Sequence, residues 1–80
     1  MKQLTVKYFA LFRESTGLDE EQFTSGAATA ADLFEELRER HPGLQSFDHM
    51  KLAINDELVQ WSASLNDGDV VLLFPPVAGG

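Results

Sequence analysis

Cysteine is absent from the 80 residues of this sequence. Without a thiol, the chain forms no disulfide, offers no thiolate nucleophile and gives no cysteine ligand to a metal ion. The sequence also lacks an apolar run long enough to span a membrane, and its first residues alternate in polarity, unlike a signal peptide. These absences predict a soluble protein of a reducing compartment, and we expect it to be cytoplasmic with no membrane partner.

Positive charge is scarce. Six Lys and Arg residues stand against 13 Asp and Glu residues, which gives a formal net charge of −7. Nucleic-acid binding depends on the neutralisation of phosphates by Lys and Arg, so we expect no nucleic-acid partner. The acidic balance favours a protein partner with a basic face, at least for steering. It equally serves to keep a small domain in solution, and the sequence alone leaves both interpretations open.

The chain is short for an enzyme with its own cleft. A chain of 80 residues forms one domain and buries only about 60–65% of the surface of its unfolded state. Little core remains for a cavity with walls of its own. We therefore expect a binding or carrier module, with no self-contained active site.

Motifs for metal, phosphate or nucleophile chemistry are missing as well. The Asn-Asp-Gly-Asp sequence at residues 66–69 lacks the spacing and the distal Glu of a calcium loop. His41 and His49 stand eight residues apart across a helix-breaking Pro-Gly pair, which is not a metal-ligand spacing. No serine lies in a nucleophile elbow, and no Gly-rich phosphate loop is present. We expect no metal site and no cofactor bound by this chain.

Periodicity predicts five strands. Leu4, Val6 and Tyr8 alternate with more polar residues and indicate a strand over residues 2–9. A polar, edge-like strand is expected over residues 20–24, and a short helical turn over residues 10–14. Residues 51–54 and 57–59 are expected to form a hairpin around Asn55 and Asp56, which tolerate positive φ. The apolar run at residues 70–74 predicts the last strand.

One helix is strongly indicated after Thr29, a good N-cap. Its apolar residues recur at the spacing of a single helix face and are Ala30, Leu33, Phe34 and Leu37. Three acidic side chains are expected to face water: Glu35, Glu36 and Glu39. The Pro-Gly pair at residues 42–43 should end the helix.

The order of these elements predicts the fold class. A continuously apolar strand such as residues 70–74 is typical of a central position with both faces covered. If it lies beside the first strand in a mixed sheet, with the helix across one face, the result is an α+β, β-grasp (ubiquitin-like) roll. We expect one β-grasp domain over residues 1–74 and an extended tail over residues 75–80.

The tail carries the one unusually placed reactive group. Pro75 and Pro76 stop the last strand and direct the chain away from the sheet, and Gly79 and Gly80 suit a narrow channel. Six residues reach roughly 20 Å at about 3.3–3.6 Å each. A frayed terminus is the alternative interpretation. The α-carboxylate of Gly80 is inert as it stands, but activation as a mixed anhydride with AMP would make it an acyl electrophile, and sulfur transfer would then give a thiocarboxylate.

Aromatic residues near the tail suggest a docking surface. The chain has more aromatic side chains than so small a core needs. Phe9, Phe12 and Phe74 lie closest to the tail in the expected fold. We expect that they form an exposed apolar patch for a partner.

The two ends of the sequence resemble a known family. Residues 66–80 read NDGDVVLLFPPVAGG, and this end is similar to that of the small subunit of molybdopterin synthase (MoaD). Residues 9–14, FALFRE, followed by Gly17, look like the start of the same family. A Gly-Gly end alone would be weak evidence, whereas the Phe-Pro-Pro-Val-x-Gly-Gly end in a chain of this length is specific.

The resemblance implies a ubiquitin-like sulfur carrier of molybdenum cofactor biosynthesis. An ATP-dependent activating enzyme would adenylate the carboxyl group of Gly80, and a sulfur donor would convert it to a thiocarboxylate. The thiocarboxylate would then donate sulfur to cyclic pyranopterin monophosphate inside the large subunit of molybdopterin synthase. The two kinds of subunit would form a heterotetramer with sulfurtransferase activity.

The resemblance also assigns residues. The tail that inserts into the large subunit would comprise Pro75, Pro76, Val77, Ala78, Gly79 and Gly80. The apolar interface would comprise Phe9, Leu58 and Phe74. Three alternatives remain: the sulfur carrier of thiamine thiazole synthesis, a ubiquitin-like protein modifier, and a β-grasp interaction module whose tail has no chemical role.

Overall fold

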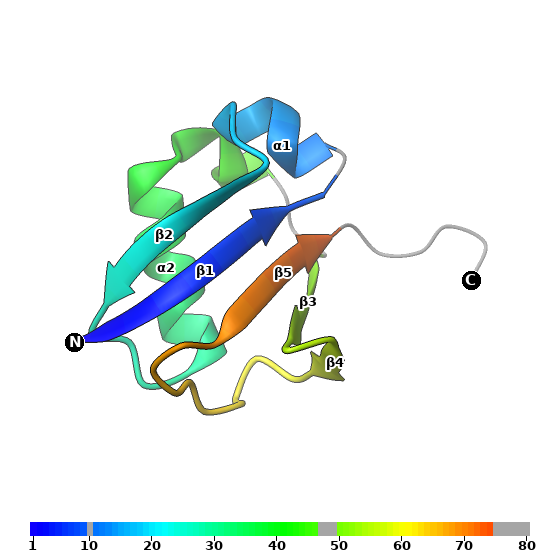
Figure 1. Cartoon of the computed structure of the whole chain (residues 1–80). Coiled ribbons are helices and arrows are strands. Elements are labelled where there is room, and N and C mark those ends of the chain that lie inside the picture. The colour runs from blue at the N-terminus through cyan, green and yellow to red at the C-terminus, as the bar shows by residue number, and fades with distance from the viewer. Residues whose placement is uncertain (10, 47–49, 75–80) are drawn as a thin grey trace.

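The computed structural model describes residues 1–9, 11–46 and 50–74, and Figure 1 shows a sheet with the long helix across one face. The strands are β1 (Lys2–Tyr8), β2 (Glu20–Ser25), β3 (Lys51–Ile54), β4 (Glu57–Val59) and β5 (Val70–Phe74). The helices are α1 (Leu11–Thr16), α2 (Ala30–Arg40) and the 3₁₀ helix η1 (Pro42–Ser46). The five strands and the long helix lie where periodicity predicts them.

The strands form one mixed sheet in the order β2-β1-β5-β3-β4. β1 and β5 are parallel neighbours, whereas β1 pairs antiparallel with β2 and β3 pairs antiparallel with both β4 and β5. The first and last strands therefore lie side by side in the middle of the sheet, as predicted. With α2 across one face, this is the expected α+β, β-grasp roll (Figure 1).

Helix α2 begins and packs as its sequence predicts. The Thr29 side chain accepts a hydrogen bond from the Asp32 backbone N–H at 3.3 Å, which caps the helix. The buried residues of the helix are those of the predicted stripe: Ala30, Leu33, Phe34 and Leu37. Trp61 lies half-buried against Phe34, with 5.2 Å between ring centroids.

One of the three glutamates expected in water has a buried partner. Glu36 is half-buried, and its carboxylate accepts a hydrogen bond from the hydroxyl of Ser25 at 2.8 Å. Ser25 is 1% exposed, and its oxygen also accepts from the Ala27 N–H. The prediction was wrong for Glu36 because this partner comes from β2, which is distant in the sequence. Glu35 and Glu39 are exposed as expected.

The two faces of β5 differ, which corrects the expectation that both are covered. Val71 and Leu73 are buried under α2, whereas Val70, Leu72 and Phe74 are only half-buried. The reason is that the helical layer lies on one side of the sheet alone (Figure 1). The other side, called the open face below, leaves the apolar residues of a central strand partly in contact with water.

The hairpin between β3 and β4 has the predicted two-residue turn. Asn55 and Asp56 have φ values of 52° and 69°, and Ile54 pairs with Glu57 across the turn. Two successive positive φ values are typical of the type I′ turn, whose twist matches that of the flanking strands.

Candidate functional site

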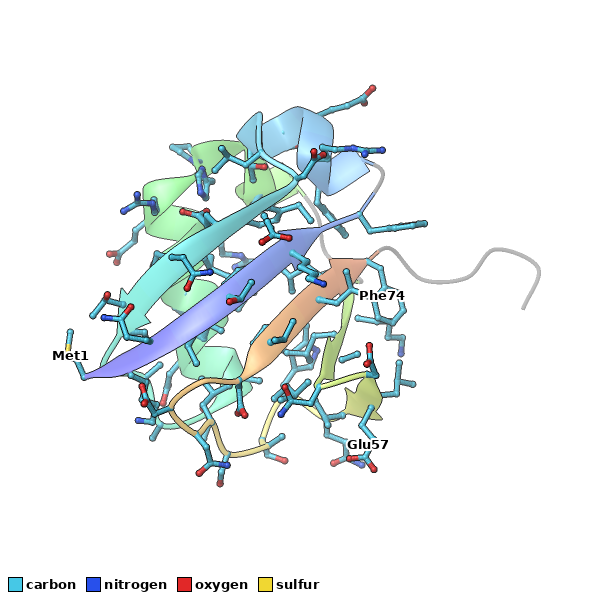
Figure 2. The ribbon with its side chains drawn as sticks, in the orientation of Figure 1. Met1, Glu57 and Phe74 are labelled. Carbon is cyan, nitrogen blue, oxygen red and sulfur yellow. The ribbon has the colours of Figure 1, made fainter. Side chains whose placement is uncertain are left out.

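The predicted reactive end of the chain lies beyond the part that the structure describes. Gly80 and the other tail residues, Pro75, Pro76, Val77, Ala78 and Gly79, are outside the described residues. The structure does describe β5, the strand that leads into the tail. Figure 2 labels Phe74, the last residue of β5, at the end of the sheet where parallel β1 also ends.

β5 is held firmly along its length. It is bonded to β1 on one side and to β3 on the other, so neither of its edges is free. At its start, the Thr5 N–H donates to the Asp69 carbonyl at 3.0 Å, and the Asn55 N–H donates to the Val70 carbonyl at 2.8 Å. The strand that leads into the tail is therefore paired on both sides in the centre of the sheet.

The turn before β5 is built around a buried carboxylate. Asp69 is 7% exposed and accepts hydrogen bonds from the Asn55 side-chain amide at 2.9 Å and the Asn66 backbone N–H at 2.8 Å. Gly68 has φ of +88°, a conformation that favours glycine, and its N–H donates to the Gln3 carbonyl. These contacts give Asp69 and Gly68 of the Asn-Asp-Gly-Asp sequence a structural role in the turn.

An apolar hollow lies on the open face beside the end of β5. Phe9, Leu72 and Phe74 line it, and its volume is about 250 Å³. Phe9 is 58% exposed, yet its backbone N–H still donates to the Leu73 carbonyl at 3.2 Å. This bond continues the β1–β5 pairing by one residue, so Phe9 is placed beside Phe74.

Leu58 extends the same apolar surface across the sheet. The strand register aligns Leu72 of β5 with Ala53 of β3, and Ala53 with Leu58 of β4. Side chains of directly paired residues share a face, so the three lie in one row on the open face. Leu58 is 69% exposed. We use the name apolar patch for Phe9, Leu58, Leu72 and Phe74.

The structure corrects the predicted membership of this patch in two ways. Phe12 is only 1% exposed, because α1 turns its side chain into the core, so the expectation of an exposed Phe12 was wrong. Leu72 is the member that the sequence did not single out, since it stands within a uniformly apolar strand. Phe9, Leu58 and Phe74, named from the resemblance, all lie on the open face. Large side chains left in water so close together make this surface a candidate for partner binding.

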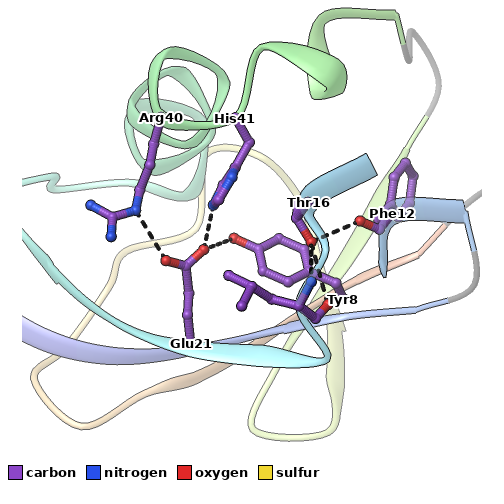
Figure 3. A network of polar contacts seen from close by, with 7 residues as sticks. Tyr8, Phe12, Thr16, Glu21, Arg40 and His41 are labelled. Carbon is purple, nitrogen blue, oxygen red and sulfur yellow. Dashed lines mark hydrogen bonds and ion pairs between the residues drawn. The ribbon is translucent and has the colours of Figure 1, made fainter. Parts of the chain in front are cut away.

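A polar cluster on the opposite side ties the two N-terminal strands to the end of α2 (Figure 3). One oxygen of Glu21 accepts a hydrogen bond from the Tyr8 hydroxyl and contacts Nε2 of His41. Its other oxygen pairs with Nε of Arg40 at 3.1 Å. The rings of Tyr8 and His41 meet edge to face with centroids 5.7 Å apart.

The cluster shifts two ionisation equilibria. Burial opposes ionisation of Glu21, but hydrogen bonds from Tyr8 and His41 and the charge of Arg40 outweigh it, so the pKa of Glu21 lies below its ordinary value of 4.5. Burial, with the hydrogen bond to Glu21 and its negative charge, raises the pKa of Tyr8 well above 10.0. Glu21 is thus held as an anion and Tyr8 as a neutral donor. Because each of these groups is satisfied by another, the cluster is a structural tie.

Metal clusters and membrane-spanning helices are absent from the described ranges. No group of three or more His, Cys, Asp or Glu side chains within residues 1–9, 11–46 and 50–74 is arranged to hold a metal ion. Nor does any helix in this part of the chain have the length and apolar character needed to cross a membrane. The apolar patch beside the tail remains the strongest candidate site.

Comparison with known sequences identifies one family over nearly the whole chain. The model of the ThiS family matches residues 6–80. The molybdopterin synthase sulfur carrier subunit of Chlamydomonas reinhardtii is 40% identical, with 98% of this chain and 99% of that protein covered. The matched segment includes the tail as well as the domain.

Solved structures give the same result at the level of the fold. A protein from Pyrococcus furiosus assigned to molybdopterin converting factor as subunit 1 superposes with a TM-score of 0.85 and is 38% identical, covering 96% of this chain and 100% of its own. The small modifier SAMP1 of Haloferax volcanii has a TM-score of 0.81 and 31% identity, covering 98% and 99%. A complex of subunits 1 and 2 of molybdopterin-converting factor from Helicobacter pylori contains a chain with a TM-score of 0.68 and 26% identity, covering 98% and 99%.

Proposed function

The chain belongs to the ThiS family, and on that basis we propose that it is the sulfur-carrier small subunit of molybdopterin synthase. The observation that carries the proposal is its similarity, over nearly its whole length, to a molybdopterin synthase sulfur carrier subunit. The Phe-Pro-Pro-Val-Ala-Gly-Gly end and the exposed apolar patch at the base of the tail support it. We also propose that the protein works in the cytoplasm.

The first step in this proposal activates Gly80. Its carboxylate attacks the α-phosphorus of ATP on a separate activating enzyme, pyrophosphate leaves, and an acyl-adenylate forms. A sulfide equivalent from a donor then adds to the acyl carbon, and AMP leaves with the electron pair of the broken C–O bond. The product is a thiocarboxylate, a soft nucleophile. ATP is thus a substrate of the activating enzyme, and this chain needs no cofactor of its own.

The second step takes place on the large subunit. The sulfur of the thiocarboxylate attacks a carbon of cyclic pyranopterin monophosphate, and a carbon–oxygen bond at that carbon breaks. Water then hydrolyses the resulting thioester, which leaves the sulfur on the pterin and returns Gly80 to its carboxylate. Two such transfers supply the two sulfur atoms of the molybdopterin dithiolene. The chain therefore acts as the sulfur-donating subunit of a sulfurtransferase, which we propose to be a heterotetramer with two large subunits at its centre.

The described domain has a clear part in this scheme. β5 fixes the base of the tail in the sheet, and roughly 20 Å of tail can then reach a site within a partner. The apolar patch lies beside the end of β5, where the tail begins, so a partner that covers the patch is placed to receive the tail. Phe9, Leu58 and Phe74 are the docking residues that we propose, together with Leu72.

The alternatives differ in the acceptor of the activated glycine. A thiamine-pathway carrier would give its sulfur to a thiazole precursor, and a protein modifier would form an isopeptide bond with a lysine. The likeness to SAMP1 lies in the fold and in 31% of the residues. The sequence identity to SAMP1 is lower than the 40% identity to the molybdopterin synthase sulfur carrier subunit of Chlamydomonas reinhardtii. This difference favours the molybdopterin pathway.

Reconstitution tests the proposed function. The thiocarboxylated chain, the large subunit and cyclic pyranopterin monophosphate should together yield molybdopterin, detected as a fluorescent oxidised derivative. A chain that lacks Gly80 should give none while still binding the large subunit. Failure of the thiocarboxylated chain to yield product, while a thiazole precursor or a lysine acceptor is modified, would reject this function.

A further inference from the structure

Most cations of this acidic protein are engaged within the domain. Lys2 donates to the Ala27 carbonyl at 2.9 Å. Three arginines pair with carboxylates: Arg13 with Asp19 at 3.2 Å, Arg38 with Glu35 at 3.7 Å, and Arg40 with Glu21 at 3.1 Å. With 13 acidic residues available, such pairing is the expected state of a cation here.

Lys7 and Lys51 are different. Both side chains are exposed, and neither forms an ion pair or hydrogen bond with any residue in the described part of the chain. Glu20 lies directly opposite Lys7 in the β1–β2 register, yet the two side chains do not pair. Within the part of the chain that the structure describes, two cations thus lack partners, in a protein of formal charge −7.

These two lysines lie within the area of the apolar patch, on opposite sides of β5. Lys7 pairs with Leu72 across β1 and β5, and Lys51 pairs with Phe74 across β3 and β5. Each lysine therefore stands on the open face directly beside a patch residue. The two lysines lie two strands apart across the sheet and two residues apart along it. This offset corresponds to roughly 12 Å between their Cα atoms. Lys51 also lines a hollow of about 520 Å³ that it shares with Leu58.

Coverage of the patch by a partner would change the surroundings of both ammonium groups. A lysine that loses water without gaining a carboxylate carries an uncompensated desolvation penalty, whereas the attraction of a carboxylate offsets that penalty. Charges at the rim of an interface mainly set specificity, association rate and salt dependence. The rest of the chain is acidic and would repel carboxylates of a partner. Lys7 and Lys51 therefore make the patch the favoured place for such carboxylates to bind.

We propose that Lys7 and Lys51 bind two carboxylates of the large subunit, one on each side of β5, within the apolar surface that covers the patch. This inference rests on the proposed function and adds the chemistry of the partner surface. It also refines the expectation of a partner with a basic face: whatever the partner's overall charge, its docking surface carries acidic residues opposite these two lysines.

The test compares two variants of equal charge. Lys7→Gln with Lys51→Gln takes the formal charge from −7 to −9, and so does Thr24→Glu with Ser64→Glu at exposed positions outside the patch. Binding to the large subunit is measured by calorimetry at low and moderate salt. We expect the lysine variant to bind about tenfold more weakly at low salt and with a shallower salt dependence, while the control stays within about threefold of wild type.

A second variant keeps the charge. Lys7→Arg with Lys51→Arg should restore binding and its salt dependence, which a loss of fold or of aliphatic packing alone would not predict. Equal weakening in the lysine variant and the control would overturn the inference, because net charge would then explain the effect. Unchanged binding of the lysine variant would overturn it as well.

Binding of the wild-type chain to the large subunit distinguishes a failure of this inference from a failure of the proposed function. If wild type does not bind the large subunit, the proposed function fails, and the inference fails with it. If wild type binds but only the complex with the activating enzyme depends on the two lysines, the proposed function stands and the assignment of the carboxylates to the large subunit is wrong.

Discussion

Phe9 allows partner docking to be separated from folding. Its side chain is 58% exposed, and its backbone hydrogen bond to Leu73 does not depend on the ring. Phe9→Ala should therefore weaken binding to the large subunit by about 2 kcal/mol, the size of an aromatic anchor at an interface, and change the free energy of unfolding by only about 0.5 kcal/mol. Calorimetric titration and thermal melting measure the two effects.

Leu18→Ala is the matched control for Phe9. Leu18 is also an exposed apolar residue, at 37%, but it lies outside the apolar patch. Its truncation should leave binding unchanged. Equal losses of affinity in both variants, or a fall in melting temperature that accounts for the weaker binding of Phe9→Ala, would count against the patch as the docking surface.

Glu21 gives the domain a dependence on pH. Because its pKa is lower in the folded state, Glu21 stabilises the fold fully above its ordinary pKa of 4.5, and this contribution is lost as pH falls through the folded value. Glu21→Gln should cost about 1–3 kcal/mol at neutral pH, since Arg40 and His41 lose a buried partner. The loss should shrink as pH falls below the ordinary pKa of 4.5, as followed by chemical denaturation over a pH series.

Glu20→Gln supplies the comparison for Glu21. Glu20 is the adjacent acid on the same strand, but it is exposed and faces the other side of the sheet. The Glu20→Gln substitution should change the free energy of unfolding only slightly at every pH. A stability difference between Glu21→Gln and wild type that does not change with pH would contradict the role given to the ionised carboxylate.

Polar partners of this kind were beyond prediction from the sequence. The Tyr8 and His41 side chains that contact Glu21 are 13 and 20 residues away along the chain. Hydrophobic periodicity places Glu21 on a strand but does not reveal which polar groups the fold brings to it. The same reason explains why Glu36 was expected in water.

At the scale of elements, the turn between β3 and β4 is hydrogen-bonded to the start of β5 through Asn55. The Asn55 side chain donates to Asp69 at 2.9 Å and accepts from the Val70 N–H at 2.9 Å, while its backbone has φ of 52°. Asn55→Ala should cost about 2–3 kcal/mol, because it removes two hydrogen bonds and alanine disfavours positive φ. Urea unfolding measures the loss.

Asp56→Gly is the informative partner variant in this turn. Asp56 has φ of 69° and is exposed, and type I′ turns favour glycine at this position. It should change stability by no more than about 0.5 kcal/mol in either direction. If Asp56→Gly is as harmful as Asn55→Ala, the account of the turn in terms of the Asn55 hydrogen bonds is wrong.

Elements with a clear period were predictable to within about one residue. Leu4, Val6 and Tyr8 alternate, and the stripe of α2 repeats at the helical spacing, so local physics determines both. The second face of β5 was not predictable in this way. A uniformly apolar strand indicates burial on both sides, whereas here Leu72 and Phe74 remain half-buried because no second layer covers them.

At the scale of the whole molecule, the uncovered part of the sheet and the start of the tail lie at the same end of β5. A domain of 80 residues with a single long helix cannot cover both faces of a five-stranded sheet. The uncovered apolar residues cluster beside the end of β5, where the tail begins. The sequence indicated the fold and the tail, but only the strand register brings Leu72, Lys7 and Lys51 into the same surface.

The central claim is that the carboxyl group of Gly80 carries sulfur. The most direct measurement is the intact mass of the chain after incubation with its activating enzyme, ATP and a sulfide donor. The account predicts a gain equal to the replacement of one oxygen by sulfur, located at Gly80 by fragmentation and absent from a chain that lacks Gly80. An unchanged mass for the wild-type chain, or the same gain in the truncated chain, would contradict it.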